Sequence, residues 1–128
     1  MADVTIIDVS GGSYASVTTS GIVASAGAGQ IPCENGKDQR LAVWVKNGDD
    51  ESVKFTVQAP VSGGGVRASL GDLAVTIAAG DEALIPLYDT ARFKVIADDH
   101  ITFTLTDSAD GALESGELAN VTIVAVQL

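Results

Sequence analysis

Only His100 and Cys33 have the chemistry of a base and a nucleophile, because the chain holds one histidine and one cysteine. His100 follows Asp98 and Asp99 where a turn leads into an apolar run, and Cys33 lies in a glycine-rich stretch far earlier in the chain. Nucleophilic catalysis needs the base within hydrogen-bond reach of the nucleophile, and no motif joins these two residues. We therefore expect a surface histidine beside two carboxylates, no catalytic residue, no cofactor and no enzymatic activity.

Acidic residues gather in short loops where a calcium ion could bind, at 49–51, at 98–99 and along 107–114. The last of these, DSADGALE, lacks the alternate-residue oxygen ligands of an EF-hand loop, and its central Asp-Gly step is typical of a turn. The glycine run at 62–65 is followed by neither a Lys-Ser/Thr pair nor a helix pattern, so it does not predict phosphate binding. We expect solvated turns and no metal site, with structural calcium as the alternative.

Asp89 and Arg92 are a second kind of candidate, because they flank an expected tight turn in the run LYDTARFKV. An acid and an arginine at this spacing can form a local ion pair, which contributes about 0–1 kcal/mol when exposed. Alternatively, Arg92 is presented to a partner, since a guanidinium group binds carboxylates across interfaces. Both interpretations stay open at the level of the sequence.

The elements that must position these residues have the two-residue periodicity of β-strands. Within 71–107 we expect four strands, LAVTIAA, EALIPLYD, ARFKVIAD and ITFTLTD, with turns at Gly80-Asp81 and Asp98-Asp99. Apolar residues alternate with small or polar ones along the first and last of them, so one face of each strand is buried. The inward residues are Leu73, Val75 and Ile77 in the first, and Ile101, Phe103 and Leu105 in the last.

Similar patterns lie on both sides of this block. The run 40–46 is apolar on both faces, which predicts a central strand, and Asn47-Gly48 followed by the alternating run 52–59 predicts a β-hairpin. The closing run, 120–128, is apolar enough for the middle of a sheet or a subunit contact. Further expected elements are a strand at 3–9, two weak strands within 14–24, an edge strand at 66–70 and an acidic loop at 108–119. About 8–10 short strands predict an all-β fold, an antiparallel β-sandwich or jelly roll.

We expect a single domain with two parts: residues 1–40, with one or more strands and a glycine-rich arm or loop, and a β-sandwich core over residues 41–128. The run Ser25–Lys37 is the longest stretch without periodicity, and loops of this length are uncommon unless they are functional or flexible. It is either a surface loop or an arm that a partner orders. Its candidate partner-binding residues are Gln30, Ile31 and Pro32.

The net charge of -10 disfavours several function classes. An acidic surface repels nucleic acid phosphates and anionic membranes, so we expect neither as a partner. No apolar run reaches the length of a membrane span, and the N-terminal MADVTIIDVS lacks the features of a signal peptide. A single cysteine allows no disulfide within the chain, which suits folding in a reducing compartment.

The run GDLAVTIAAGDEALIPLYDTARFK, followed by a strand and the closing VTIVAVQL, resembles small β-sandwich proteins of tailed bacteriophages. The resemblance covers about residues 41–128, and its matching residues are Gly71, Asp72, Leu73, Val75, Gly80 and the segment Tyr88–Phe93. It implies a capsid decoration protein (a head auxiliary or cement protein) that binds the major capsid protein on the outer capsid surface. It also implies a homo-oligomer, with a trimer favoured, that is made in the host cytoplasm and located on the virion.

Another function class stays open beside this one, a carbohydrate- or receptor-binding module of a tail fibre or adhesin. Such a module needs exposed aromatic rings or calcium-binding carboxylates on one face, and the chain holds one tryptophan and two tyrosines. A glycoside hydrolase would need two acids flanking a cleft, and the 17 acidic residues produce pairs by chance. Neither composition nor spacing favours these alternatives.

Overall fold

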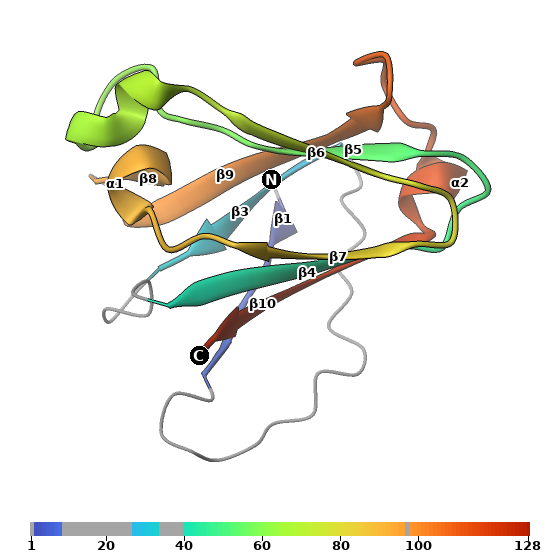
Figure 1. The fold of residues 1–128 in the computed structure, drawn as a ribbon, viewed down its shortest axis with the longest axis horizontal. Coiled ribbons are helices and arrows are strands. Elements are labelled where there is room, and N and C mark those ends of the chain that lie inside the picture. The colour runs from blue at the N-terminus through green and yellow to red at the C-terminus, as the bar shows by residue number, and fades with distance from the viewer. Residues whose placement is uncertain (1, 9–26, 34–39, 97) are drawn as a thin grey trace.

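The chain folds into two β-sheets packed face to face, with only short helices near the ends of the strands (Figure 1). The computed structural model describes residues 2–8, 27–33, 40–96 and 98–128. The architecture is a β-sandwich, which confirms the fold class that the strand patterns predict. No helix within these described ranges is long and apolar enough to cross a membrane.

The elements of the described residues are β1 (Ala2–Asp3), β2 (Ile6–Asp8), β3 (Ala28–Pro32), β4 (Leu41–Asn47), β5 (Val53–Val57), the 3-10 helix η2 (Val66–Leu70), β6 (Leu73–Ile77), β7 (Glu82–Pro86), α1 (Thr90–Phe93), β8 (Lys94–Val95), β9 (His100–Asp107), α2 (Ser115–Leu118) and β10 (Val121–Gln127).

The first sheet has the strand order β1-β3-β9-β5-β6, with β8 paired to β9, and the second has the order β2-β10-β4-β7. Most neighbouring strands run antiparallel, but the pairs β1–β3 and β2–β10 are parallel. The closing strand β10 lies between β2 and β4, and β4 lies between β10 and β7. Both apolar strands are therefore interior, as their sequences predict.

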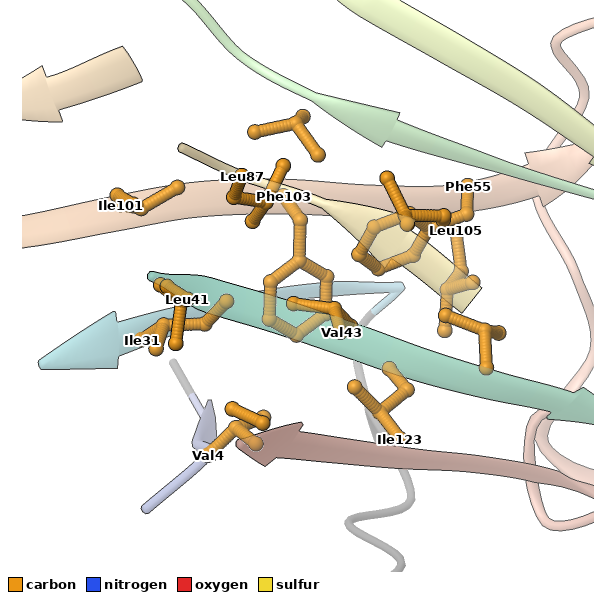
Figure 2. Close-up of a cluster of buried hydrophobic side chains, with 14 of the residues drawn as sticks. Val4, Ile31, Leu41, Val43, Phe55, Leu87, Ile101, Phe103, Leu105 and Ile123 are labelled. Carbon is orange, nitrogen blue, oxygen red and sulfur yellow. The ribbon is translucent and has the colours of Figure 1, made fainter. Parts of the chain in front are cut away.

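The hydrophobic core fills the space between the two sheets, where their inward faces meet (Figure 2). Phe55 of β5 and Phe103 of β9 are at most 1% exposed, and their ring centroids lie 5.1 Å apart. The alternation predicted for β9 is confirmed, because Ile101 and Leu105 also point inward. Other labelled members of the cluster are Val4, Ile31, Leu41, Val43, Leu87 and Ile123.

The predicted hairpin of β4 and β5 is wrong, because the two strands belong to different sheets. Residues 48–52 carry the chain from the second sheet to the first, and the turn at 78–81 carries it back from β6 to β7. Alternation along two successive strands is the same whether their inward faces lie side by side or meet across the core. The sequence pattern therefore could not separate a hairpin from a crossing between sheets.

A buried asparagine joins these two crossings. Asn47 is 2% exposed, and its side-chain Nδ2 donates to the carbonyl oxygens of Ile77 and Ala78 at 3.0 and 3.2 Å. The same nitrogen donates to the carbonyl oxygen of Glu51 at 2.8 Å, and its Oδ1 accepts the amide hydrogen of Asp49 at an N–O distance of 3.0 Å. The Asn-Gly step thus works here through the side chain of the asparagine.

The predicted loop or arm at Ser25–Lys37 is wrong for residues 28–32, which form β3 between β1 and β9. Gly29 and Ile31 are the inward residues of this strand. Because Gly29 has no side chain, an inward position looks neutral in the sequence and the two-residue period is hidden. The flanking residues 25–26 and 34–37, and the weak strands expected within 14–24, lie outside the described residues.

Three further strand predictions are wrong. The expected edge strand at 66–70 is the helix η2, and the run ARFKVIAD contains α1 and only the two-residue strand β8. The expected strand at 3–9 is divided, within the described residues, between β1 in the first sheet and β2 in the second. The expected loop at 108–119 contains α2, which begins with a capping box. Segments this short, with a few apolar residues each, fit one helical turn as well as a strand.

Candidate functional site

Exposed apolar side chains of the described residues gather in two places. Six large ones are between 42% and 104% exposed: Val61, Leu70, Leu84, Tyr88, Ile96 and Leu128. Four of them, Val61, Leu70, Tyr88 and Ile96, lie in the loops and short helices at the end of the sandwich that carries η2 and α1 (Figure 1). We call these four residues the η2–α1 surface.

Backbone contacts hold the segments of this surface together. The amide of Ile96 donates to the carbonyl oxygen of Gly63 at 3.0 Å, and Gly64 forms an isolated antiparallel bridge with Val95. A Cβ atom at Gly65 would lie 2.7 Å from the carbonyl oxygen of Ala91, so only glycine fits this approach of η2 to α1 without a shift. A surface on a fixed backbone loses little conformational entropy when a partner binds.

Arg92 fastens α1 to the end of η2. Its Nε donates to the carbonyl oxygen of Gly71 at 2.8 Å, and its Nη2 donates to that of Asp72 at 2.9 Å. Its guanidinium carbon lies 4.8 Å from the ring centroid of Phe93, which is 2% exposed and anchors α1 in the core. Arg92 therefore directs these donors to its own chain, where they hold the loop end in place.

The expected ion pair between Asp89 and Arg92 is wrong, because Asp89 binds Arg67 of η2 instead. The Nε of Arg67 donates to both carboxylate oxygens of Asp89, at 2.8 and 3.0 Å. The side chains of Arg67 and Asp89 are 55% and 32% exposed, so we expect this pair to contribute about 0–1 kcal/mol to stability. The pair adds a polar group beside the η2–α1 surface.

A hollow of about 510 Å³ opens beside the same surface, lined by Ala59, Pro60, Val61, Ala68, Ser69, Gly71 and Asp72. Asp72 is its only ionisable lining residue, and its Oδ1 accepts the amide hydrogen of Ala59 at an N–O distance of 2.8 Å. The hollow thus offers small apolar side chains and backbone groups. This lining suits the side chain of a protein partner.

The other sequence candidates lie on β3. Gln30 donates through Nε2 to Oδ1 of Asp3 at 2.8 Å, and Pro32 pairs with His100 of β9. Since Val95 of β8 pairs with His100 from the other side, Pro32 lies two strands away from β8 and near the η2–α1 end. Ile31 is 0% exposed and packs in the core, so its side chain is not presented to solvent.

Cys33 and His100 come close through the β3–β9 pairing, but their side chains face opposite sides of the sheet. Cys33 is 2% exposed, and its Sγ donates to the carbonyl oxygen of Ile31 at 3.4 Å. His100 precedes the inward residue Ile101 and points outward, with Nδ1 4.0 Å from Asp98. Within the described ranges, no group of three or more His, Cys, Asp or Glu residues is placed to hold a metal ion.

Comparison of the chain with protein-family models, with curated proteins and with solved structures finds no match.

Sequence reasoning missed Val61, Leu70 and Ile96 as candidate binding residues. It also missed Arg67, because the acid that pairs with it, Asp89, lies 22 residues away in the chain. A signal for Val61 was present, since an apolar residue between Pro60 and a serine-glycine run belongs to no strand that could bury it. Apolar residues within turn sequences are therefore candidates for binding surfaces.

Proposed function

We propose that this chain is a structural virion protein that binds the outer surface of a phage capsid, contacts the major capsid protein and stabilises the capsid. The observation that carries the proposal is the η2–α1 surface, where four apolar side chains are exposed on a backbone fixed by neighbouring loops. Exposed apolar patches on soluble domains mark binding surfaces for other proteins. The resemblance of residues 41–128 to capsid decoration proteins supplies the class of the partner.

Val61 and Ile96 are the strongest anchors of such a contact, because they are 104% and 58% exposed in the free chain. Full burial of an aliphatic side chain contributes about 1.5–3 kcal/mol. Arg67 and Asp89, at the border of the apolar residues, would exchange their exposed mutual pair for charged groups of the capsid. Arg92 would act indirectly by holding α1 against η2.

The net charge of -10 suits this function in two ways. Like charge keeps free copies soluble before assembly, and it favours partners with basic patches. With one cysteine the chain forms no internal disulfide, which suits folding in the reducing host cytoplasm before the capsid is bound.

A carbohydrate- or receptor-binding module remains the second candidate, because one observation favours it. The ring of Tyr88 is 51% exposed at the same end as the hollow, and aromatic rings stack on sugars. The only tryptophan, Trp44, lies on β4 of the second sheet and does not join Tyr88 in a platform. A glycan array tests this candidate directly.

Sedimentation with capsids of the same virus, prepared without this protein, tests the proposal. We expect saturable pelleting at a fixed ratio to the major capsid protein. Replacing Val61 or Ile96 with aspartate should weaken pelleting roughly tenfold or more, because a charge would be buried in the contact. Thr76→Asp is the matched control, since Thr76 is exposed on the outward face of β6.

An absence of pelleting with capsids in every expansion state would refute the decoration function. Pelleting that Val61→Asp and Ile96→Asp leave unchanged would keep the function but show that another surface makes the contact. A specific hit on the glycan array, lost in Tyr88→Ala, would favour the second candidate.

A further inference from the structure

The outward faces of the two sheets differ sharply in chemistry. On the first sheet, the outward positions of β9, β5 and β6 are rich in threonine: Thr102, Thr104, Thr106, Thr56 and Thr76. Lys54 lies among them, paired with Thr76 on one side and with Thr106 on the other. This face is polar, as expected for a sheet surface that stays in contact with water.

The outward face of the second sheet is apolar across all four strands. Its register places Ile7, Val126, Ala42 and Pro86 in one row, and Val124, Trp44 and Leu84 in the next. These are outward residues because the alternate positions, such as Val43, Ile85 and Ile123, pack in the core. Leu84 is 69% exposed, and Leu128, at the end of β10, is 42% exposed, whereas Val124 and Ala42 on the two central strands are only 2% and 3% exposed. We call these outward residues of β2, β10, β4 and β7 the apolar sheet face.

The apolar sheet face carries no net charge, although the chain carries -10. Of the three charged residues on the four strands, Asp8 ends β2 at an inward position of the alternation, and Lys46 and Glu82 point outward, with their Nζ and Oε1 atoms 3.6 Å apart. Lys46 also lies over the ring of Trp44, with Nζ 4.3 Å from the ring centroid. A second negatively charged copy can therefore approach this face without meeting unpaired like charges. A basic capsid patch would gain no attraction there.

We propose that the apolar sheet face binds the same face of a second copy of this chain, through a two-fold contact. Such a contact is self-complementary, since Leu84 and Trp44 of each copy meet the apolar rows of the other. The inference concerns the free protein and does not depend on the proposed capsid function.

The size of the face sets the strength of this contact. The strands β2, β10, β4 and β7 hold 3, 7, 7 and 5 residues, and at about 3.3 Å per residue and about 4.8 Å between strands they make a flat area of roughly 350 Å². A standard stable interface buries about 800 Å² per partner, so the contact belongs to the weak class. We expect a monomer–dimer equilibrium in the micromolar range, in place of the trimer that the family resemblance implies.

Sedimentation equilibrium of the purified chain, with intrinsic fluorescence over the same concentrations, tests the proposal. Because Trp44 is the only tryptophan and lies on the apolar sheet face, its emission should shift to shorter wavelength as the dimer forms. Leu84→Glu and Leu84→Lys should each raise the dissociation constant roughly tenfold or more, since both place a charge in an apolar contact. Leu84 is 69% exposed, so both variants should fold.

Thr76→Glu is the matched control, because Thr76 also lies exposed on an edge strand but faces outward from the first sheet. It should leave both the dissociation constant and the emission shift unchanged. A wild-type chain that stays monomeric up to millimolar concentration, or that forms a trimer, would overturn the proposal. A dimer that both Leu84 variants leave intact would overturn it as well. Since no capsid is present, none of these outcomes depends on the decoration function.

Discussion

At the scale of single residues, Asn47 and Arg92 show how polar side chains hold this sandwich together. Both direct their donors to backbone carbonyl oxygens of another segment: those of Ile77 and Ala78 for Asn47, and those of Gly71 and Asp72 for Arg92. A carbonyl group left without a partner in a buried loop is costly. These two side chains therefore fix loops that the hydrophobic core does not reach.

Replacing Asn47 with alanine should lower the free energy of unfolding by about 2–4 kcal/mol, because each hydrogen bond that is lost contributes about 1 kcal/mol net to stability. Asn47→Asp should also destabilise, since a carboxylate of the same size keeps the acceptor of the Asp49 amide but cannot donate to carbonyl oxygens. Urea denaturation measures both changes. The control is Gln30→Ala, which loses one exposed side-chain bond to Asp3 and should cost less than about 0.5 kcal/mol. Equal stability of Asn47→Ala and the wild type would contradict this role.

At the scale of the elements, the sequence predicted strands well where the inward side chains are large and pack against other large side chains in the core. In β4, β9 and β10 the inward residues are branched or aromatic, apart from Asn47, Asp107, Ala125 and Gln127, and their period is visible without the structure. In β3 the period is hidden by Gly29, and the four residues of α1, Thr90–Phe93, fit a single helical turn as well as a strand. The pairing of strands was not readable, because alternation reports which face is buried and not which strand lies alongside.

The candidate site was only partly predictable for the same reason. Asp89 and Arg92 were found as charged residues in a turn, but their partners, Arg67 and the carbonyl oxygens of Gly71 and Asp72, come from another segment. Local spacing suggested that the two residues pair with each other. The packing of α1 against η2 decides otherwise, and this packing has no signature in either segment alone.

Gly65 and Gly116 should respond differently to substitution by alanine, because only Gly65 lies at the contact between η2 and α1. A methyl group at Gly65 would lie 2.7 Å from the carbonyl oxygen of Ala91, so Gly65→Ala should push η2 away from α1 and cost about 1–3 kcal/mol. Gly116 of α2 has open space around its Cβ position, so Gly116→Ala should be neutral or stabilise by up to about 1 kcal/mol. Thermal unfolding of both variants measures the contrast. The expectation fails if the two substitutions change the melting temperature equally.

At the scale of the whole molecule, the surfaces of the chain differ in chemistry. The threonine-rich outward face of the first sheet is polar, the apolar sheet face carries no net charge, and the η2–α1 surface presents four apolar side chains at one end. A face-to-face dimer through the second sheet would leave both η2–α1 surfaces free. The two proposed contacts, with a second copy and with the capsid, therefore use different surfaces of the chain.

The net charge of -10 makes the dimer sensitive to salt, and the direction of the effect identifies the interface. Two copies repel each other over a distance comparable to the Debye length, which falls from about 20 Å near 20 mM salt to about 6 Å near 300 mM. Because the apolar sheet face contributes no net attraction between charges, added salt should remove repulsion only. We expect the dimer dissociation constant to fall roughly threefold to tenfold between 20 and 300 mM NaCl.

Sedimentation equilibrium at the two salt concentrations measures this change, and Leu84→Glu, which should stay largely monomeric at both, is its control. A dissociation constant that rises with salt would mean that charge pairs between copies, such as Lys46 with Glu82, hold the dimer in place of the apolar rows. Capsid pelleting at the same two salt concentrations should weaken as salt is added if the capsid patch is basic, because salt then screens an attraction. Opposite slopes for the two equilibria would assign them to two different surfaces of the same chain.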